Sequence, residues 1–203
     1  IRRLISVLGI INTPFKKTSV IAVIIILCVS TIILHNSFFR IREKDIGETI
    51  VKNLSSVKGA NYSIQDIKIR KQLNFDIRKV VVYSFPSEND YEIVGFADFF
   101  KGLNNKYAVG NIYNEKDFIY NFVKRGLKDQ YLIIAGKNHH ATICSIEVTK
   151  KDGSRYTEDL SKEKYFIFKA DVSSLDHLHI LDKEGKDLPK ETLDIYVEEK
   201  IKD

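Results

Sequence analysis

The chain has 203 residues, of which 44% are hydrophobic and 29% charged, and its 12 Phe and 10 Tyr are ample for a packed core. This composition excludes a disordered chain, and two cysteines exclude a small fold held by disulfides. Residues 1–39 hold four Lys or Arg and no acid, whereas residues 40–203 carry 28 basic against 27 acidic side chains, so the net charge of +5 lies at one end. Without a one-sided basic surface, we expect no nucleic-acid partner.

Residues 18–39 form a run of 22 residues without a formal charge, of which 15 are apolar. A helix of that length is about 33 Å long, enough to cross the hydrocarbon core of a bilayer. Basic residues flank both ends, where they suit the headgroup region. We therefore predict a cytoplasmic segment over residues 1–17 and a membrane-spanning helix over residues 18–39, whose partner is the lipid bilayer.

A cleaved signal peptide is the main alternative for this segment. Residues 34–39 lack the small-x-small pattern that signal peptidase needs, which favours an uncleaved anchor. Four basic residues precede the span and three follow it closely. This small excess of positive charge on the N-terminal side favours a cytoplasmic N-terminus. We predict a single-pass protein of the cell membrane with an extracytoplasmic C-terminal domain; the alternative is a reversed topology.

The first part of the outer domain, residues 40–116, is predicted to be a helix and an antiparallel meander. Apolar residues recur at helical spacing from Ile46 to Val57, and Gly59 is suited to end the helix. The period then changes to two, and turn residues separate four predicted strands, over residues 63–70, 78–85, 91–100 and 106–113. The expected result is an α+β, cystatin-like unit in which the helix crosses one face of the sheet.

The second part, residues 117–203, is predicted to be a small β-sandwich. Residues 117–125 fit either a helix closed by Gly126 or a strand, and the strand is the preferred interpretation. Further short strands are predicted over residues 131–135, 142–149, 165–170, 177–181 and 193–197. Repeated short strands without an intervening helix predict an Ig-like sandwich as a second subdomain.

Three sequence segments are similar to a known group of proteins. They are Val94-Gly95-Phe96-Ala97, Lys101-Gly102-Leu103-Asn104-Asn105-Lys106-Tyr107 and Tyr131-Leu132-Ile133-Ile134-Ala135-Gly136-Lys137-Asn138. Over residues 90–190 the chain resembles uncharacterised single-pass membrane proteins of low-GC Gram-positive bacteria. The resemblance implies a bacterial surface location and an anchored β-rich domain, and it carries over no catalytic residue.

Two histidines are the strongest candidates for metal ligands. On a strand, His177 and His179 point to the same, solvent-facing side at a spacing that could share a metal. Only Asp176, Asp182 and the distant His139-His140 pair are available as further ligands. We therefore predict no functional metal and no cofactor.

Catalytic patterns are equally sparse. The sequence contains no Gly-x-Ser-x-Gly motif, phosphate loop or dinucleotide fingerprint. Cys144 shares its strand face with Ile146 and Val148, so we expect a core thiol. The acidic pair Glu158 and Asp159 is expected in a charged turn, without a glycine loop or an aromatic wall nearby. We predict no catalytic residue and no enzyme.

Aromatic residues gather around the central predicted hairpin, and five of them are the candidate binding residues: Tyr91, Phe96, Phe99, Phe100 and Tyr107. Tyr91 and Phe99 share one face of their strand, while Phe96 and Phe100 share the other. Because one helix covers only one face, the opposite aromatics must be covered by the second subdomain, which is the preferred interpretation, or by a partner.

These features together predict a membrane-anchored extracytoplasmic binding or accessory module. Its partner would be a peptide, an envelope component or another membrane protein, recognised by a sheet face or edge. The alternatives are an envelope hydrolase or metal-dependent enzyme that uses the surface histidines, and a cytoplasm-facing regulator.

Overall fold

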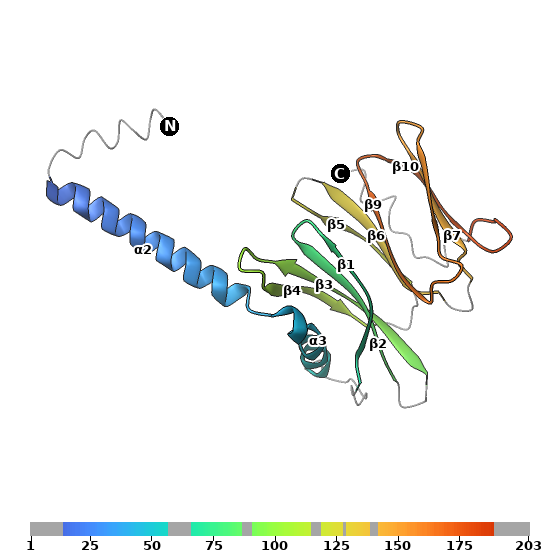
Figure 1. Cartoon of the computed structure of the whole chain (residues 1–203), viewed down its shortest axis with the longest axis horizontal. Coiled ribbons are helices and arrows are strands. Elements are labelled where there is room, and N and C mark those ends of the chain that lie inside the picture. The colour runs from blue at the N-terminus through green and yellow to red at the C-terminus, as the bar shows by residue number, and fades with distance from the viewer. Residues whose placement is uncertain are drawn as a thin grey trace. The chain divides into compact units, whose positions relative to one another are not determined.

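The computed structural model of the chain describes residues 14–56, 66–86, 91–114, 119–127, 129–138 and 142–188, and the structural statements below refer to these residues. Contacts divide the chain into two compact units, Ile1–Arg40 and Ile41–Asp203. The first contains one long helix, and the second contains the short helices and all the described strands (Figure 1).

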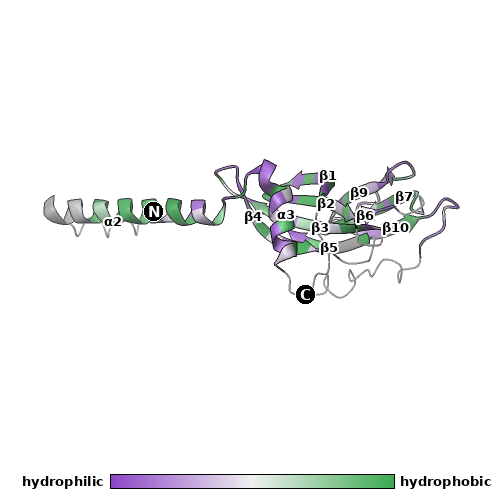
Figure 2. Ribbon diagram, turned by 90° about the horizontal axis from the view of Figure 1, so that it is seen from below, coloured by the Kyte–Doolittle hydropathy of each residue, from purple (hydrophilic) through white to green (hydrophobic). Residues whose placement is uncertain are grey.

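The long helix α2 (Pro14–Phe38) has the properties of a membrane span. Proline suits its first turn, where a backbone N–H would have no helical partner. Residues 20–38 are apolar over about 28 Å, and none of this stretch is buried within the chain (Figure 2). The Thr31 hydroxyl donates to the Leu27 carbonyl at 2.8 Å, which satisfies this polar group within the helix. The predicted apolar helix is confirmed, and the stretch of it that is long and apolar enough to cross a membrane is Val20–Phe38, against the predicted residues 18–39.

The second unit begins with the short 3-10 helix η1 (Glu43–Asp45) and helix α3 (Ile46–Ser55), after which all the described elements are strands. These strands are β1 (Lys68–Phe75), β2 (Arg78–Pro86), β3 (Glu92–Lys101), β4 (Tyr107–Tyr113), β5 (Ile119–Arg125), β6 (Gln130–Lys137), β7 (Ser145–Lys150), β8 (Arg155–Asp159), β9 (Tyr165–Asp171) and β10 (Leu175–Leu181). Among the described strands, every pairing is antiparallel and the sheet orders are β1-β2-β3-β4, β5-β6-β9 and β10-β7-β8.

Helix α3 packs on one face of the β1–β4 sheet. Its buried residues Ile46, Ile50 and Leu54 recur every four positions and so share one helix face. They contact a core that includes Tyr83 and Phe99, which project from β2 and β3 toward the helix. The predicted α+β arrangement, a helix on an antiparallel meander, is confirmed.

The opposite face of the β1–β4 sheet packs on the β5-β6-β9 sheet. Val82 and Phe96 alternate with the helix-facing residues and form a second core with Ile133 and Ile167. The far side of β6 and β9 forms a third core with the β10-β7-β8 sheet. The contacts therefore run through four layers, one helix followed by three sheets (Figure 1).

The strand predictions differ most from the structure at β1 and β8, and β7 begins at Ser145 instead of residue 142. The first strand, predicted over residues 63–70, runs from Lys68 to Phe75 and ends in a tight turn at Asp76. Asp76 has φ of 46°, a conformation that aspartate tolerates because its side chain can bond to nearby backbone. Strand β8 was not predicted, because its sequence Arg-Tyr-Thr-Glu-Asp lacks apolar alternation. The ambiguous segment 117–125 contains a strand, β5, as preferred.

The two predicted subdomains, residues 40–116 and 117–203, share an apolar core. The rings of Phe96 on β3 and Phe122 on β5 lie 4.2 Å apart between centroids. The boundary between residues 116 and 117 stays a prediction, because residues 115–118 lie outside the described residues. The helix end near Gly59 and the strand over residues 193–197 lie outside them as well.

Candidate functional site

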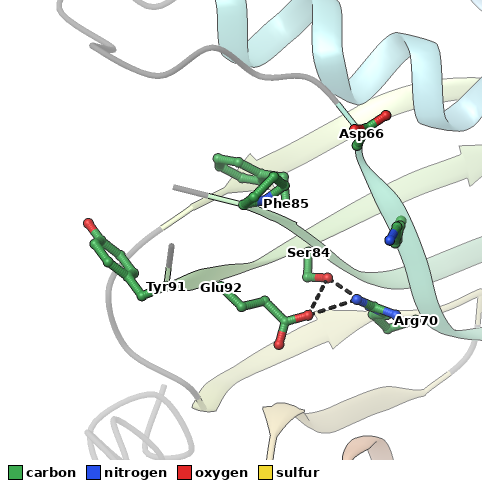
Figure 3. Close-up of a pocket in the computed structure, with 8 residues that line it drawn as sticks. Asp66, Arg70, Ser84, Phe85, Tyr91 and Glu92 are labelled. Atoms are coloured by element: carbon green, nitrogen blue, oxygen red, sulfur yellow. Dashed lines mark hydrogen bonds and ion pairs between the residues drawn. The ribbon is translucent and has the colours of Figure 1, made fainter. Parts of the chain in front are cut away.

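A pocket of about 220 Å³ lies where β1, β2 and β3 come together (Figure 3). Its polar lining includes two basic residues, two acidic residues, a serine and an aromatic rim, namely Lys68, Arg70, Asp66, Glu92, Ser84 and Tyr91. The pocket thus concentrates charge at one end of the sheet.

Strand register explains why these side chains converge. Lys68 pairs with Ser84 across β1 and β2, and the register shifts by one residue around Arg70. Such a bulge redirects the side chain at the extra position. Ser84 alternates along β2 with Tyr83 and Phe85, which belong to the helix-facing core. Ser84 consequently lies on the side of the sheet that faces β6 and β9, where Arg70 reaches it.

One oxygen of Glu92 is the centre of the hydrogen-bond network. Its Oε1 accepts from Arg70 Nη2 at 2.8 Å, from Ser84 Oγ at 2.9 Å, and from the Tyr165 hydroxyl. Arg70 Nε also donates to Ser84 Oγ at 2.7 Å, which closes the triangle drawn in Figure 3. The Arg70 guanidinium lies 5.1 Å from the centre of the Tyr165 ring. Glu92 therefore joins β1, β2 and β9 at a single point.

The second oxygen of Glu92 faces two lysines. Lys137 Nζ lies 3.0 Å from Oε2, and Lys164 Nζ lies 3.9 Å from it. Partial burial alone would raise the pKa of Glu92. Hydrogen bonds from Tyr165, Lys137 and Ser84, together with the Lys137 charge, outweigh that effect and bring this pKa down to about 2. Glu92 is therefore ionised throughout the physiological pH range.

Tyr165 shows the reciprocal effect. Partial burial and the hydrogen bond to the Glu92 carboxylate raise the pKa of the Tyr165 phenol to about 12. Its hydroxyl consequently remains a neutral donor near neutral pH. Neither Glu92 nor Tyr165 is suited to exchange protons during a reaction at that pH, because such groups need a pKa near it.

A second ionic cluster surrounds the buried carboxylate of Asp98 on β3. Arg78 Nη1 lies 2.9 Å and Lys124 Nζ 2.8 Å from its oxygens, and Asn111 Nδ2 donates at 3.0 Å. A side chain at Gly110 would have its Cβ only 2.5 Å from Asp98 Oδ2, so glycine leaves the space that the carboxylate occupies. The Asp98 carboxylate is fully buried in this cluster, which holds β5 against the first sheet.

A third ionic contact holds the start of the second unit to the β1–β4 sheet. The ammonium of Lys79 is buried and lies 2.8 Å from Glu43 of η1. It also donates to Gln72 at 3.2 Å and lies 5.6 Å from the centre of the Tyr107 ring. Ile41 adds two backbone hydrogen bonds with Tyr107, at 2.7 and 3.0 Å. These contacts fasten Ile41 and η1 to the β1–β4 sheet.

The five predicted binding aromatics divide by burial. Phe96, Phe99 and Tyr107 are at most 3% exposed and belong to the cores described above. Phe100 is half-buried beneath the guanidinium of Arg78, and its ring does not line the pocket. Tyr91, at 43% exposed, lines the pocket. The second sheet covers Phe96, as the preferred interpretation predicted, and among these five Tyr91 is the residue placed to meet a ligand.

The surface histidines lie where the sequence placed them. His177 and His179 are exposed on β10, and their ring nitrogens lie 3.5 Å from Asp176 and 2.6 Å from Asp187 respectively. Within the described ranges, no three His, Cys, Asp or Glu side chains are grouped to hold a metal. The His139-His140 pair lies outside those ranges.

Cys144 is less buried than the sequence predicted. It is half-buried and precedes β7, whereas Ile146 and Val148, two and four residues further on, are buried. Its backbone joins neighbouring segments, because its N–H donates to Leu181 and its carbonyl accepts from Leu160. Its thiol therefore lies at the margin of the core.

Sequence reasoning missed the pocket residues Arg70, Ser84 and Glu92. The available signal was Ser84, a polar residue within the otherwise apolar part of β2, since a buried hydroxyl needs a hydrogen-bonding partner. The identity of that partner depends on the strand register, which the sequence pattern does not specify.

Comparison of the chain with models of protein families, with curated proteins and with solved structures finds no match. The function must therefore be inferred from the geometry of the chain itself.

Proposed function

We propose that this protein is a membrane-anchored binding module that recognises a peptide, an envelope component or a membrane-protein partner through the pocket between β1, β2 and β3. In this proposal α2 is an uncleaved anchor of the cell membrane, with its N-terminus in the cytoplasm and Ile41–Asp203 outside. An anchor raises the concentration of a binding site near the bilayer. We also propose that the meander with α3 is cystatin-like and that the two further sheets form an Ig-like sandwich.

The observation that carries this proposal is the state of Glu92. Both oxygens of its carboxylate are engaged by donors from β1, β2, β6 and β9, and these contacts lower its pKa to about 2, so Glu92 is a fixed negative charge that orders the basic groups around it. Groups whose positions and charges are fixed before a ligand arrives favour recognition, because little ordering remains to be done on binding. The same features are unfavourable for general acid or base catalysis.

The surface of β1 favours recognition through the pocket over addition of a partner strand. β1 is an edge of its sheet, and it carries Lys68, Arg70 and Lys71 together with a register shift. Charged side chains and bulges are features that keep edge strands from pairing with other chains. The occupant is therefore expected to insert a group into the pocket and not to extend the sheet.

Photocrosslinking from the pocket rim tests this function. The full-length chain is produced in cells of its native host with the photoreactive residue p-benzoylphenylalanine in place of Tyr91. The matched control carries the same residue in place of Tyr156, which is also exposed but lies on β8 of the third sheet. Membrane fractions are then compared after irradiation.

The expected result is a discrete crosslinked product from position 91 that position 156 does not give. Mass spectrometry of that product identifies the partner. Equal products from both positions, or none from position 91, would contradict the proposed recognition surface.

A further inference from the structure

The pocket lining carries as many carboxylates as cations, and a positive excess appears when the charged residues next to the lining are counted with it. Among the described residues in and next to it there are five cationic side chains and three carboxylates, a difference of two charges. The cations are Lys68, Arg70, Lys71, Lys137 and Lys164, and the carboxylates are Asp66, Glu92 and Glu163.

The internal ion pairs engage the neighbouring lysines with Glu163 and Glu92, which leaves Lys68 as the cation of the lining without a partner among the described residues. Lys71 Nζ pairs with Glu163 at 2.6 Å, so these two charges offset each other. Glu92 accepts from donors on both oxygens, and a carboxylate has about four lone-pair positions in all. It therefore has little capacity to neutralise a further cation. Lys68 is exposed and makes no ion pair or hydrogen bond through its ammonium within the part of the chain that the structure describes.

Arg70 lines the pocket, and its neighbours hold its guanidinium in a fixed position. Its Nε and Nη2 are occupied by Ser84 and Glu92, and its plane lies near the Tyr165 ring. The side chain nevertheless remains 30% exposed and lines the cavity. A guanidinium that is oriented by its neighbours and open on one side can bind an anion with little loss of conformational freedom.

We propose that the pocket binds an oxyanion, a carboxylate or phosphate group of the ligand, between the ammonium of Lys68 and the guanidinium of Arg70. This inference rests on the proposed binding function and specifies the chemistry of what is bound. A cavity of about 220 Å³ is smaller than the 300–1,000 Å³ typical of sites that enclose a whole small molecule, so it receives one terminal group of a larger ligand. Tyr91 lies across the pocket from Asp66 and Arg70 and offers a ring to the adjoining part of that ligand (Figure 3).

Lysine footprinting of the wild-type, full-length chain in detergent tests the proposal. An amine-acetylating reagent is applied in inorganic phosphate, in acetate, or in chloride at equal ionic strength, and mass spectrometry follows each lysine. Lys68 reports on the pocket. Lys106, exposed in the hairpin at the other end of β3, is the internal control.

With a dissociation constant of about 1 mM, about 10 mM probe should slow acetylation of Lys68 about tenfold, because only the unliganded fraction reacts. Protection in phosphate alone assigns a phosphate group, protection in acetate alone assigns a carboxylate, and protection in both supports the shared oxyanion chemistry. No protection of Lys68, or equal protection of Lys106, would overturn the proposal.

The variant R70Q separates specific binding from general screening. It removes the guanidinium and keeps Lys68, so protection of Lys68 should fall below about twofold. Circular dichroism confirms that the variant is folded, and full protection in a folded R70Q would overturn the role of Arg70. If Lys68 is not protected but crosslinking from position 91 succeeds, the binding module stands and its ligand is not an oxyanion. If Lys68 is protected and crosslinking fails, the anion site stands without the proposed partner.

Discussion

Replacing the buried carboxylate Asp98 with Asn is the most direct perturbation of how the first two sheets are joined. The substitution keeps the size of the side chain and removes its charge. Arg78 and Lys124, each with only 11% of the side chain exposed, then lose their common counterion. A buried cation without its partner is strongly destabilising, because it has given up hydration without an ion pair in return.

The expected cost follows from the burial. Removing one partner of a buried pair costs about 3–5 kcal/mol, and Asn retains one hydrogen-bond acceptor, so the lower end of about 3 kcal/mol is expected. A domain of this size changes its melting temperature by about 2–4 °C per kcal/mol, which gives a decrease of about 6–12 °C. Since domains are stable by only about 5–15 kcal/mol, Asp98→Asn should remain folded at room temperature.

The assay is urea and thermal unfolding of Ile41–Asp203, the compact unit without α2. The matched control is Glu163→Gln, which neutralises a carboxylate paired with Lys71 where both side chains are 41–44% exposed. An exposed pair contributes at most about 1 kcal/mol. Equal losses of unfolding free energy in the two variants would refute the reasoning that burial makes the Asp98 cluster structural.

Four further predictions concern the core, the pocket, the topology and the histidines. Ile50→Asp places a charge in the α3 core and should abolish cooperative thermal unfolding of Ile41–Asp203, whereas Lys52→Asp on the exposed side of α3 should not; an unchanged melting temperature for Ile50→Asp would rule out the packing of α3. Because folding lowers the pKa of Glu92 from its ordinary value of 4.5, the ionised carboxylate stabilises the fold at pH values above 4.5, and this contribution is lost as the pH falls toward 2. Unfolding free energies measured from pH 7 to 2 should therefore decline less in Glu92→Gln than in the wild type, and parallel profiles would contradict this. With Cys28 and Cys144 replaced by Ser, a membrane-impermeant maleimide should label Ser154→Cys in intact cells on full-length, membrane-bound protein; labelling only after lysis would place the domain in the cytoplasm, and labelled protein in the medium would show a cleaved signal peptide. Elemental analysis should find less than stoichiometric zinc, copper or nickel, and a bound metal that is lost in the His177→Ala, His179→Ala double variant would favour the metal-dependent enzyme instead.

Periodic apolar residues made the core of the first sheet predictable. Ile46, Ile50 and Leu54 face one way on any helix, and a strand alternates its side chains, so burial follows from spacing alone. The same reasoning fails for β8, because an edge strand buries little and needs no apolar pattern. It also misplaced β1, whose charged residues hide the alternation of Leu73 and Phe75.

The candidate site was far less predictable than the core. Glu92 is 22 residues from Arg70 and 73 residues from Tyr165 along the sequence. Only the pairing of three strands and the packing of two sheets bring these side chains together. The aromatic cluster drew attention because Phe96 and Phe99 are conspicuous in the sequence, but large apolar side chains are more often core than surface. Tyr91 alone among the five was both conspicuous and exposed.

The two ionic clusters on β3 show why one end of the sheet interface is open and the other closed. Glu92, Val94, Phe96 and Asp98 alternate along β3 on the face toward the second sheet, with a charge at each end and an apolar pair between them. The apolar pair supplies burial that favours contact between the sheets in any register. Each carboxylate, in contrast, is satisfied only when the second sheet presents Lys124 of β5, or Lys137 of β6 and the Tyr165 hydroxyl of β9, at the right position. Asp98 is fully buried by its partners, but Glu92 keeps 22% of its side chain exposed and borders the cavity. The Glu92 end of the interface thus borders a charged opening lined by residues of β1, β2 and β3 and of the segments beside them, in which Tyr165 and Lys137 of the second sheet hold Glu92. A substitution that shifts the packing of the sheets, such as one at Phe96 or Phe122, should therefore also change the reactivity of Lys68 in the pocket.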